Sequence, residues 1–565
     1  MPPSIGTGFP EFSLSRALRS GGPVPSLPLI PPFVHLHVHS NYSLREGAAR
    51  VDELAGAAAG MGMDALALTD HDGMYGAVRF TLACRGAGIR PILGAELEWG
   101  EGYHALLLAE NARGWANLCR LVTEMHIDER AQSLPPGKRP RTSFAAIAAR
   151  SEGLVALSGC ERGEVPWLVR TGRTEEAGAA LRRWLDVFGT DRFAVEVSNH
   201  LLEEDPSRNQ ALHCLARSLG VRVAATNNVH YVEPGGAATH DLLDCIRRIV
   251  PLTPATAPRG NSEYWLKSTE EMAALHPPEA LDGAREVADR CTWQLPLGVF
   301  HFPDLPAELG GPGSGSRESA TSILARRCWE GMRRRYPVVT RAMEDRLQSE
   351  LRAIRRGGFC GYFLLVADVA DHAKHRLGIR CACRGSAAGS LVAWCLGISD
   401  VDPVHHDLVF ERFMNEHRRE IPDIDIDFES ARREEVLDYV LSTYGDRTAM
   451  VGMMETFRAR AALREVGKAL GLPQSEIDAI ATAFPHISAA SIPKALETLP
   501  ELRGSGISGA RLEILLDLAV RLDAYPRHLA LHPSGVILSD EALADLMPMQ
   551  RSFAAVGRGN GYLMS

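Results

Sequence analysis

The feature that most constrains this chain is a run in which three aspartates alternate with three apolar residues, at 422–428 (Pro-Asp-Ile-Asp-Ile-Asp-Phe). Successive side chains of a β-strand point to opposite faces, so the run predicts a strand with Asp423, Asp425 and Asp427 on one face. Carboxylates about 7 Å apart repel one another unless a cation lies between them. One or two Mg²⁺ ions usually fill that role, because they also hold the oxygens of an attacking hydroxyl and a leaving phosphate. The run alone leaves one alternative open, an exposed edge strand whose acidic side chains bind no metal.

A turn rich in glycine and serine lies upstream of this run. Residues 383–390 read Cys-Arg-Gly-Ser-Ala-Ala-Gly-Ser and precede an apolar run at 391–396. Small residues let backbone N–H groups approach an anion, and we expect a helix over the apolar run whose N-terminus points to the same place. The guanidinium of Arg384 adds planar donors suited to phosphate. Alone the turn could be only a helix cap, but with the carboxylate strand it predicts phosphoryl or nucleotidyl transfer.

Composition limits the class of protein. At 565 residues and 45% hydrophobic content, the chain is long enough for about two to four domains. Its net charge of −9 gives no overall attraction to nucleic acid, so such binding depends on local patches. The arginine-rich segment Arg326–Arg356 is one candidate patch, with a solvated helix face as the alternative. The eleven cysteines form no disulfide-like framework, which predicts a cytoplasmic protein, and no apolar run reaches membrane-spanning length.

The order of apolar runs indicates how the chain is organised. Residues 33–255 alternate short apolar runs with amphipathic stretches, which predicts an α/β layer or barrel with parallel strands. We expect strands at 65–68, 91–93, 154–157 and 221–225, and helices at 51–61, 176–187 and 209–219. The composition of residues 309–316 predicts a flexible linker. Helices are expected from Ala320 to Asp371, and helical segments over 431–525.

Potential metal ligands lie at or near the ends of the predicted strands. His37 and His39 share one face of a short strand, the spacing that a shared metal requires. The other side chains of this kind are Glu46, Asp70, His71, Glu96, His104, Cys160 and His230. Because the carboxyl ends of parallel strands meet at one edge of a sheet, the pattern predicts a metal site there. It could hydrolyse phosphoesters with two or three Zn²⁺, Mn²⁺ or Fe ions, or hold one structural zinc.

With both motifs in view, the chain resembles the bacterial C-family DNA polymerases (the DNA polymerase III alpha subunit family), and most of all their error-prone branch. The segments that resemble its polymerase-and-histidinol-phosphatase (PHP) domain are 35–40, 68–73, 94–96 and 226–230. Those that resemble the palm are 361–363, 384–390 and 422–428, followed by the start of the thumb at 456–468 and a return strand of the palm at 532–536. The resemblance covers essentially the whole chain after residue 32.

The resemblance implies an α/β multidomain fold. A PHP-type (β/α) barrel-like domain would be followed by a polymerase-beta-like palm with a helical thumb insertion, without a fingers domain. The implied boundaries are a disordered Pro/Gly-rich tail at 1–32, the PHP domain at 33–255, a connector and linker at 256–320, the palm at 321–450, the thumb at 451–525 and a truncated return to the palm at 526–565.

The resemblance also implies roles for single residues. Asp425 and Asp427 would carry the catalytic Mg²⁺ pair, with Asp423 flanking them. The residues that would bind the incoming triphosphate are Arg384, Gly385 and Ser386. The PHP ligands, for Zn²⁺ or Mn²⁺, would be His37, His39, Glu46, His71, Glu96, His104, Cys160 and His230, with Asp70 beside them and His200 as a weaker candidate. The implied partners are primer-template DNA and deoxynucleoside triphosphates, and no membrane.

Departures from the family pattern affect both sites. Asn228 stands where the metal-binding form carries Asp, which weakens the case for 3′–5′ exonuclease activity, because a neutral amide is a poor Mg²⁺ or Mn²⁺ ligand. Cys383 replaces a glycine ahead of the phosphate turn, and Glu46 replaces an aspartate. The family's third catalytic aspartate and its fingers lie beyond Ser565, so we expect an incomplete polymerase.

Three functions remain open on the sequence. The first is template-directed DNA synthesis, in replication, repair and damage-tolerant synthesis. The second is metal-dependent phosphoester hydrolysis or 3′–5′ exonuclease activity by the PHP domain. The third is a non-catalytic remnant, or one half of a split polymerase that docks a missing C-terminal half.

Overall fold

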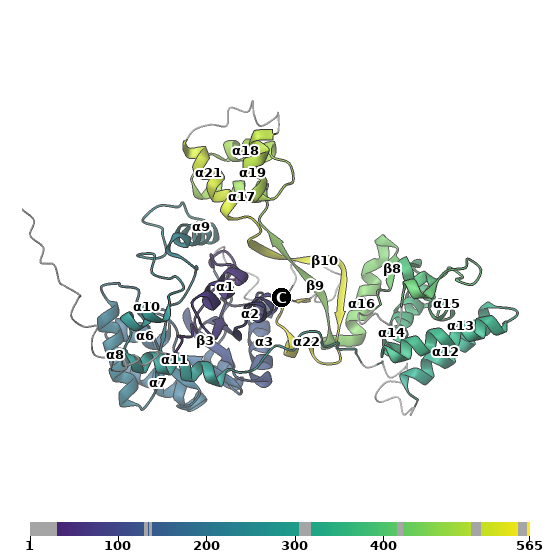
Figure 1. Cartoon of the computed structure of the whole chain (residues 1–565), viewed down its shortest axis with the longest axis horizontal. Coiled ribbons are helices and arrows are strands. Elements are labelled where there is room, and N and C mark those ends of the chain that lie inside the picture. The colour runs from purple at the N-terminus through teal and green to yellow at the C-terminus, as the bar shows by residue number, and fades with distance from the viewer. Residues whose placement is uncertain are drawn as a thin grey trace, which may run out of the picture.

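The computed structural model describes residues 31–128, 134, 138–303, 305, 318–414, 422–498, 510–551 and 562–564. The tail predicted at 1–32 falls almost entirely outside these residues, and the linker predicted at 309–316 entirely so. Figure 1 shows an α/β body at the lower left, a helical group around β8 at the right and a smaller helical group at the top. Within the described ranges, no helix has the length and apolar character needed to cross a lipid bilayer.

The N-terminal body is built on a six-stranded sheet whose order follows the chain. Its strands are β1 Ala65–Leu68, β2 Arg90–Trp99, β3 Tyr103–Ala109, β4 Leu154–Leu157, β5 Phe193–Ser198 and β6 Val223–Thr226. The segment around Val38 bridges the two ends of this sheet: Thr69 N–H donates to Val38 O (2.8 Å), and His39 N–H donates to Val229 O (2.7 Å). This segment closes the curled sheet into a barrel-like ring.

The sheet is mixed, so the prediction of parallel strands was only partly right. β2 pairs antiparallel with β3 and β3 with β4, while the remaining pairs are parallel. Three residues connect β2 to β3, too few for the crossover that parallel strands need, and Gly100 and Gly102 there adopt positive φ. The prediction ended the second strand at residue 93, whereas β2 continues to Trp99, so it missed this hairpin.

Helices flank the sheet and bury its apolar strands. Every residue of β1, β4, β5 and β6 is buried, which explains why β1 and β4 read as continuous apolar runs. The predicted helices at 51–61, 176–187 and 209–219 correspond to α1, α7 and α8. The helices of this body are α1 Val51–Gly60, α2 Ala77–Ala87, α3 Ala112–Ile127, α5 Phe144–Ala149, α6 Glu164–Arg170, α7 Thr174–Phe188, α8 Asp205–Ser218, α9 Ala237–Arg248, α10 Thr269–Leu275 and α11 Pro278–Arg290.

The helical group at the right of Figure 1 surrounds the predicted carboxylate strand. It begins with the helices predicted over 320–371, which are α12 Ala320–Arg335, α13 Arg341–Arg356 and α14 Cys360–Asp371. These pack with α15 Leu391–Cys395 and α16 Arg433–Tyr444 around one apolar core. β7 Cys381–Arg384 and β8 Asp425–Phe428 form a two-stranded antiparallel sheet. The predicted strand is therefore present over Asp425–Phe428, while Asp423 and Ile424 lie just before it.

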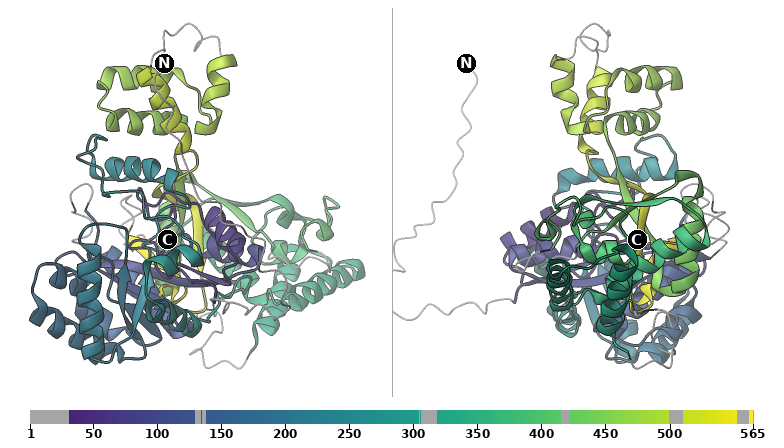
Figure 2. Two further views of the ribbon diagram at one scale, coloured as in Figure 1. Left: turned by 60° about the vertical axis from the view of Figure 1, so that its left-hand side comes forward. Right: turned by 90° about the vertical axis from the view of Figure 1, so that its right-hand side faces the viewer.

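A two-stranded ribbon, β9 Thr448–Thr456 and β10 Pro526–Leu538, links this group to the helices at the top of every view (Figures 1 and 2). Those helices are α17 Ala459–Ala469, α18 Gln474–Ala483, α19 Ile492–Thr498 and α21 Ala510–Arg521. β9 lies inside the stretch where only helical segments were predicted. Its Ala and Met residues favour helix locally, so pairing with β10 decides its conformation. α22 Leu543–Leu546, β11 Met549–Arg551 and β12 Tyr562–Met564 follow, and both strands join this sheet.

Candidate functional site

The side chains predicted as metal ligands in the N-terminal body lie together at one end of its sheet. His37 and His39 come from the closing segment, His71 follows β1, Glu96 lies within β2 and His104 is the second residue of β3. Glu46, Cys160 and His230 come from the loops before α1, after β4 and after β6. All of them are buried. The ring of strands, rather than a single loop, therefore positions this cluster.

Glu96 lies at the centre of the cluster. Both of its carboxylate oxygens face other candidate ligands, at His104 Nδ1 (3.0 Å), His71 Nδ1 (3.1 Å), His37 Nε2 (3.3 Å), Cys160 Sγ (3.4 Å) and His39 Nε2 (3.5 Å). Burial alone would raise the pKa of Glu96, but the positive charge of His104, His37 and His71 outweighs it and holds the pKa well below its usual range. Glu96 is therefore an ionised carboxylate inside the protein.

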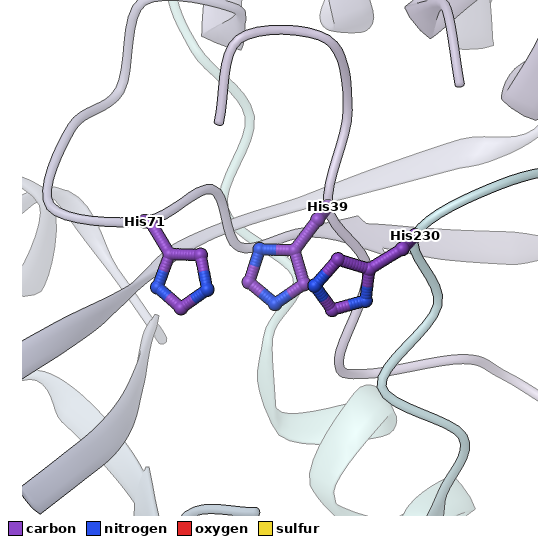
Figure 3. Close-up of side chains that lie close together, drawn as sticks. All are labelled: His39, His71 and His230. Carbon is purple, nitrogen blue, oxygen red and sulfur yellow. The ribbon is translucent and has the colours of Figure 1, made fainter. Parts of the chain in front are cut away.

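Three imidazoles line the other side of the cluster (Figure 3). The ring centroid of His39 lies 4.3 Å from that of His71 and 4.4 Å from that of His230. Glu46 Oε1 lies 3.5 Å from His71 Nε2 and 3.7 Å from His230 Nε2. Burial, and then the neighbouring His71 and His230, lower the pKa of His39 well below its ordinary value. A neutral imidazole is the form that binds a metal ion.

The donor set fits a cation. Three groups of side chains have ligand atoms within 4.8 Å of one another: His39, His71 and His230; His37, His39 and Glu96; and His71, Glu96 and His104. Among the described residues, two buried polar atoms in or beside the cluster have no hydrogen-bond partner: His104 Nε2 and Asn228 Oδ1. Such atoms are costly to bury unless something satisfies them. Imidazole, carboxylate and thiol donors suit Zn²⁺ or Mn²⁺.

Asn228 and Asp70 differ in their relation to the cluster. Asn228 is buried and has a positive φ of 42°. Its side chain is a neutral amide, so it adds no charged ligand to the cluster. The oxygens of Asp70 accept hydrogen bonds from Ser40 N–H (2.6 Å), Ser40 Oγ (2.8 Å) and Ser43 Oγ (2.7 Å). Ser43 Oγ also lies 3.1 Å from His39 Nδ1. Asp70 is outside the three groups and is linked to His39 through Ser43.

His200, the weaker candidate, is also outside the three groups. Its ring stacks on Tyr264 with centroids 3.7 Å apart, and its Nε2 lies 3.0 Å from Asn227 O. Burial lowers the pKa of His200 to about 3, so the ring is neutral. Its contacts are those of a packed aromatic side chain.

The sequence analysis missed Glu196, which contacts the cluster from β5. Glu196 Oε1 accepts hydrogen bonds from His37 Nδ1 (2.6 Å) and Thr226 Oγ1 (2.6 Å). Burial would lower the pKa of His37, but Glu196 and Glu96 raise it to about 10. A carboxylate on the outer nitrogen of a metal-binding histidine fixes the orientation of the ring. An acidic residue inside the apolar run Phe193–Ser198 was the signal that could have revealed it.

Two arginines, also missed, reach candidate ligands from outside. Arg259 Nη2 lies 3.1 Å from His230 Nε2, and its Nη1 donates to Glu161 (3.0 Å). Arg139 pairs with Glu46 and with Asp72 (3.2 Å). Both guanidinium groups are mostly buried. They add positive charge at the edge of the cluster, where an anionic substrate could meet it.

The carboxylate strand presents its aspartates as predicted. Asp425 and Asp427 are exposed, while Ile426 and Phe428 are half-buried between them and the core. Asp425 faces Arg384 across the β7–β8 ladder, and Arg384 Nε lies 3.5 Å from Asp427 Oδ2. In the described part of the chain, no group of three metal-binding side chains includes either aspartate. The strand therefore offers two carboxylates and one guanidinium to solvent.

The glycine-rich turn meets this strand at its first residues. Gly385 has a φ of 74°, and a Cβ built on it would lie 3.9 Å from Asp425 Oδ2. Arg384, Gly385 and Ser386 are exposed. A side chain at 385 would strain the backbone because of this positive φ, while a Cβ would only touch the carboxylate. The turn and the two aspartates therefore form one open surface.

The expected helix N-terminus does not complete that surface. α15 has only five residues, Leu391–Cys395, and Ser390 Oγ caps it by accepting from Ala393 N–H (3.1 Å). Ser390 is buried and its hydroxyl also donates to Glu350 (2.9 Å). Protein groups, Ser390 and Glu350, therefore already accept from two N–H groups at this helix end, whereas residues 384–386 are exposed.

Comparison with known proteins finds matches for both parts of the chain. Residues 35–200 match the family model of the PHP domain, and residues 322–558 match that of the bacterial DNA polymerase III alpha NTPase domain. The chain is 41% identical over 533 residues to an error-prone DNA polymerase of Symbiobacterium thermophilum, covering 92% of this chain and 48% of that protein.

Other relatives give the same picture. The DNA polymerase III subunit alpha of Treponema pallidum is 36% identical over 92% of this chain and 45% of its own length. An error-prone DNA polymerase of Mycobacterium bovis is 34% identical over 92% of this chain and 47% of its own length. The chain spans about half the length of the curated relatives it matches. Along most of its length, the chain is therefore similar to bacterial DNA polymerase III alpha subunits and to error-prone DNA polymerases, through a PHP domain and a DNA polymerase III alpha NTPase domain.

Proposed function

We propose that this chain supplies the palm chemistry of an error-prone DNA polymerase, in which a primer 3′-hydroxyl attacks a deoxynucleoside triphosphate. The observation that carries the proposal is the contact of the glycine-rich turn with the carboxylate strand. Asp425 and Asp427 would hold Mg²⁺, with Asp423 flanking them, and Arg384, Gly385 and Ser386 would bind the triphosphate. Bound Mg²⁺ would supply charge for the attacking and leaving oxygens. The partners would be primer-template DNA and a further polymerase segment that provides the rest of the active site.

Primer extension tests this function. The purified chain is assayed with Mg²⁺ and all four nucleotides, alone and with a co-expressed segment encoded downstream. Asp425→Asn and Asp427→Asn should abolish extension, whereas Glu434→Gln, an exposed residue in the first turn of α16, should not change it. If both aspartate variants extend primers as well as the unmodified chain, the proposal is wrong. If extension never occurs with either preparation, the chain is better described as a non-catalytic remnant.

A second function is favoured by the cluster around Glu96. We propose that it binds Zn²⁺ or Mn²⁺ through His37, His39, Glu46, His71, Glu96, His104, Cys160 and His230, and supports hydrolysis of a phosphoester such as a DNA 3′ end. Asp70 and Glu196 would orient ligands rather than bind the metal, because Ser40 and Ser43 occupy the oxygens of Asp70, and Glu196 Oε1 already accepts from His37 and Thr226. Arg139 and Arg259 would face the phosphate oxygens.

Metal content and hydrolysis separate this function from the first. The chain is loaded with Zn²⁺ or Mn²⁺, its bound metal is measured, and release of 3′ nucleotides from single-stranded DNA is followed. His37→Ala and His39→Ala should lose both metal and hydrolysis while Asp427→Asn keeps both. Stoichiometric metal without hydrolysis would indicate a structural site. Absence of bound metal in the unmodified chain would rule out both roles.

A further inference from the structure

Glu350 is a buried carboxylate that neither proposed reaction uses directly. It lies on α13 and is 1% exposed. Its Oε2 accepts hydrogen bonds from Ser390 Oγ (2.9 Å) and Val392 N–H (3.1 Å), and its Oε1 accepts from Arg346 Nε (3.1 Å). A buried carboxylate costs stability unless such donors surround it. Here its donors come from the end of the glycine-rich turn and from one arginine.

Arg346 holds the same part of the chain from its other side. Its Nη2 donates to Gly389 O (2.8 Å) and to Leu408 O (2.9 Å). A Cβ built on Gly389 would lie 2.8 Å from Val409 O, so only glycine allows this close approach. Glu350 and Arg346 therefore hold neighbouring residues of the chain. Glu350 accepts from the Ser390 hydroxyl and the Val392 N–H, and Arg346 donates to the Gly389 carbonyl.

These contacts divide the glycine-rich turn into two halves. The second half, Gly389–Val392, is buried and held by the Glu350–Arg346 pair. The first half, Arg384–Ser386, is exposed beside Asp425 and Asp427. Ala387, which joins the two halves, is buried in the core of the palm group. The position of the exposed half therefore depends on the anchored half.

We propose that Glu350 and Arg346 are a positioning pair, which fixes Gly389–Val392 so that Arg384–Ser386 stays aligned with the two aspartates for a nucleoside triphosphate. The inference rests on the proposed nucleotidyl transfer. Neither side chain touches the surface that would bind the nucleotide, so both act through the turn. A buried carboxylate at the start of α15 also explains why the phosphate contacts fall to the other half of the turn.

The test compares four variants of the whole chain. Glu350→Ala removes the acceptor, Glu350→Gln keeps one oxygen for Ser390 and Val392, and Arg346→Lys removes the planar donors. Glu344→Gln is the matched control, because Glu344 lies on the same helix, is more exposed, and pairs with Arg341 (3.7 Å). Circular dichroism shows which variants are folded. The readouts are amide hydrogen exchange over 389–396 and the affinity for dATP with Mg²⁺.

In Glu350→Ala and Arg346→Lys, exchange over 389–396 should be about tenfold faster and dATP should bind about tenfold more weakly, the effect of losing hydrogen bonds to a charged group. Glu350→Gln should lie between them and the unmodified chain, and Glu344→Gln should match the unmodified chain. If exchange over 389–396 is unchanged in folded Glu350→Ala, the pair does not anchor this segment. If exchange is faster but the affinity for dATP is unchanged, the pair does not position the nucleotide-binding half of the turn. If the unmodified chain binds no dATP, the proposed nucleotidyl transfer fails, and the exchange data still decide whether the pair holds the turn.

Discussion

At the scale of single residues, the metal cluster depends most on Glu96, because both of its oxygens face candidate ligands. Glu96→Gln removes the charge that offsets the surrounding imidazoles. We expect its affinity for Zn²⁺ or Mn²⁺, measured by calorimetry, to fall by at least about 10- to 100-fold, the range seen when supporting groups of metal sites are removed. Glu110→Gln is the control, since Glu110 pairs with Arg290 (2.6 Å) away from the cluster. Equal affinity of the two variants would contradict a central role for Glu96.

His276 makes stability depend on pH. It is buried, its Nε2 has no hydrogen-bond partner among the described residues, and burial followed by His213 and Lys267 lowers its pKa to about 4. The unfolded chain takes up this proton near pH 6.5, so the stability contributed by neutral His276 is complete above that pH and lost as the pH falls towards about 4. Between about pH 7 and pH 4.5, the free energy of unfolding of His276→Gln should therefore fall by about 2 kcal/mol less than that of the unmodified chain. Urea unfolding at the two pH values measures this, and parallel losses would contradict it.

The sequence indicated which residues belong to the metal cluster better than it indicated which side chains contact them. Histidines and carboxylates near strand ends were visible because chemistry-bearing side chains interrupt apolar runs, and the structure brings most of them together. Glu196 and Arg259 were missed since their contacts join strands and loops far apart in the chain. Asp70 was named with the ligands because spacing cannot show that Ser40 and Ser43 occupy its oxygens.

At the scale of elements, the carboxylate strand was predictable because its period of two is independent of its surroundings. The helix predicted over 391–396 is present as α15, Leu391–Cys395, but its close packing against another helix could not be predicted. Gly331 in α12 approaches α15 so closely that a Cβ would lie 1.9 Å from Cys395 O. Neither sequence pattern nor propensity records this contact. The close packing of α15 against α12 therefore depends on the absence of a side chain at Gly331.

Gly331→Ala tests this close contact. The added methyl group has to displace α15, which should cost about 1–3 kcal/mol, as overpacking does. Gly361→Ala is the matched control, because Gly361 is also in a helix, α14, and a Cβ there would meet nothing within 4 Å. Alanine should stabilise that helix by about 0.5–1 kcal/mol. If the contact is as tight as described, the midpoint of thermal unfolding falls in Gly331→Ala and rises in Gly361→Ala. If the midpoints of both variants shift equally, the contact is not tight.

At the scale of the whole molecule, the helices at the top of Figure 1 share an apolar core with the N-terminal body. Leu242, Leu243 and Ile246 of α9 belong to the same buried cluster as Phe457 and Leu463. Tyr525 Oη donates to Ala48 O (2.8 Å), two residues after the candidate ligand Glu46. The two groups therefore form one packed unit, joined to the helices α12 to α16 by the β9–β10 ribbon. Contacts between residues more than two hundred positions apart could not be read from local patterns.

Phe457→Ala tests whether this shared core is cooperative. Truncating a buried phenylalanine costs about 3–5 kcal/mol, and here the cavity would border both α17 and α9. Amide exchange should therefore increase in α17 and also in α9, which belongs to the N-terminal body. Phe363→Ala is the control, because Phe363 is also fully buried but lies in the core formed by α12 to α16, so its exchange effect should stay within those helices. If exchange in α9 is the same in Phe457→Ala and the unmodified chain, the two groups are independent, and the contact only places them side by side.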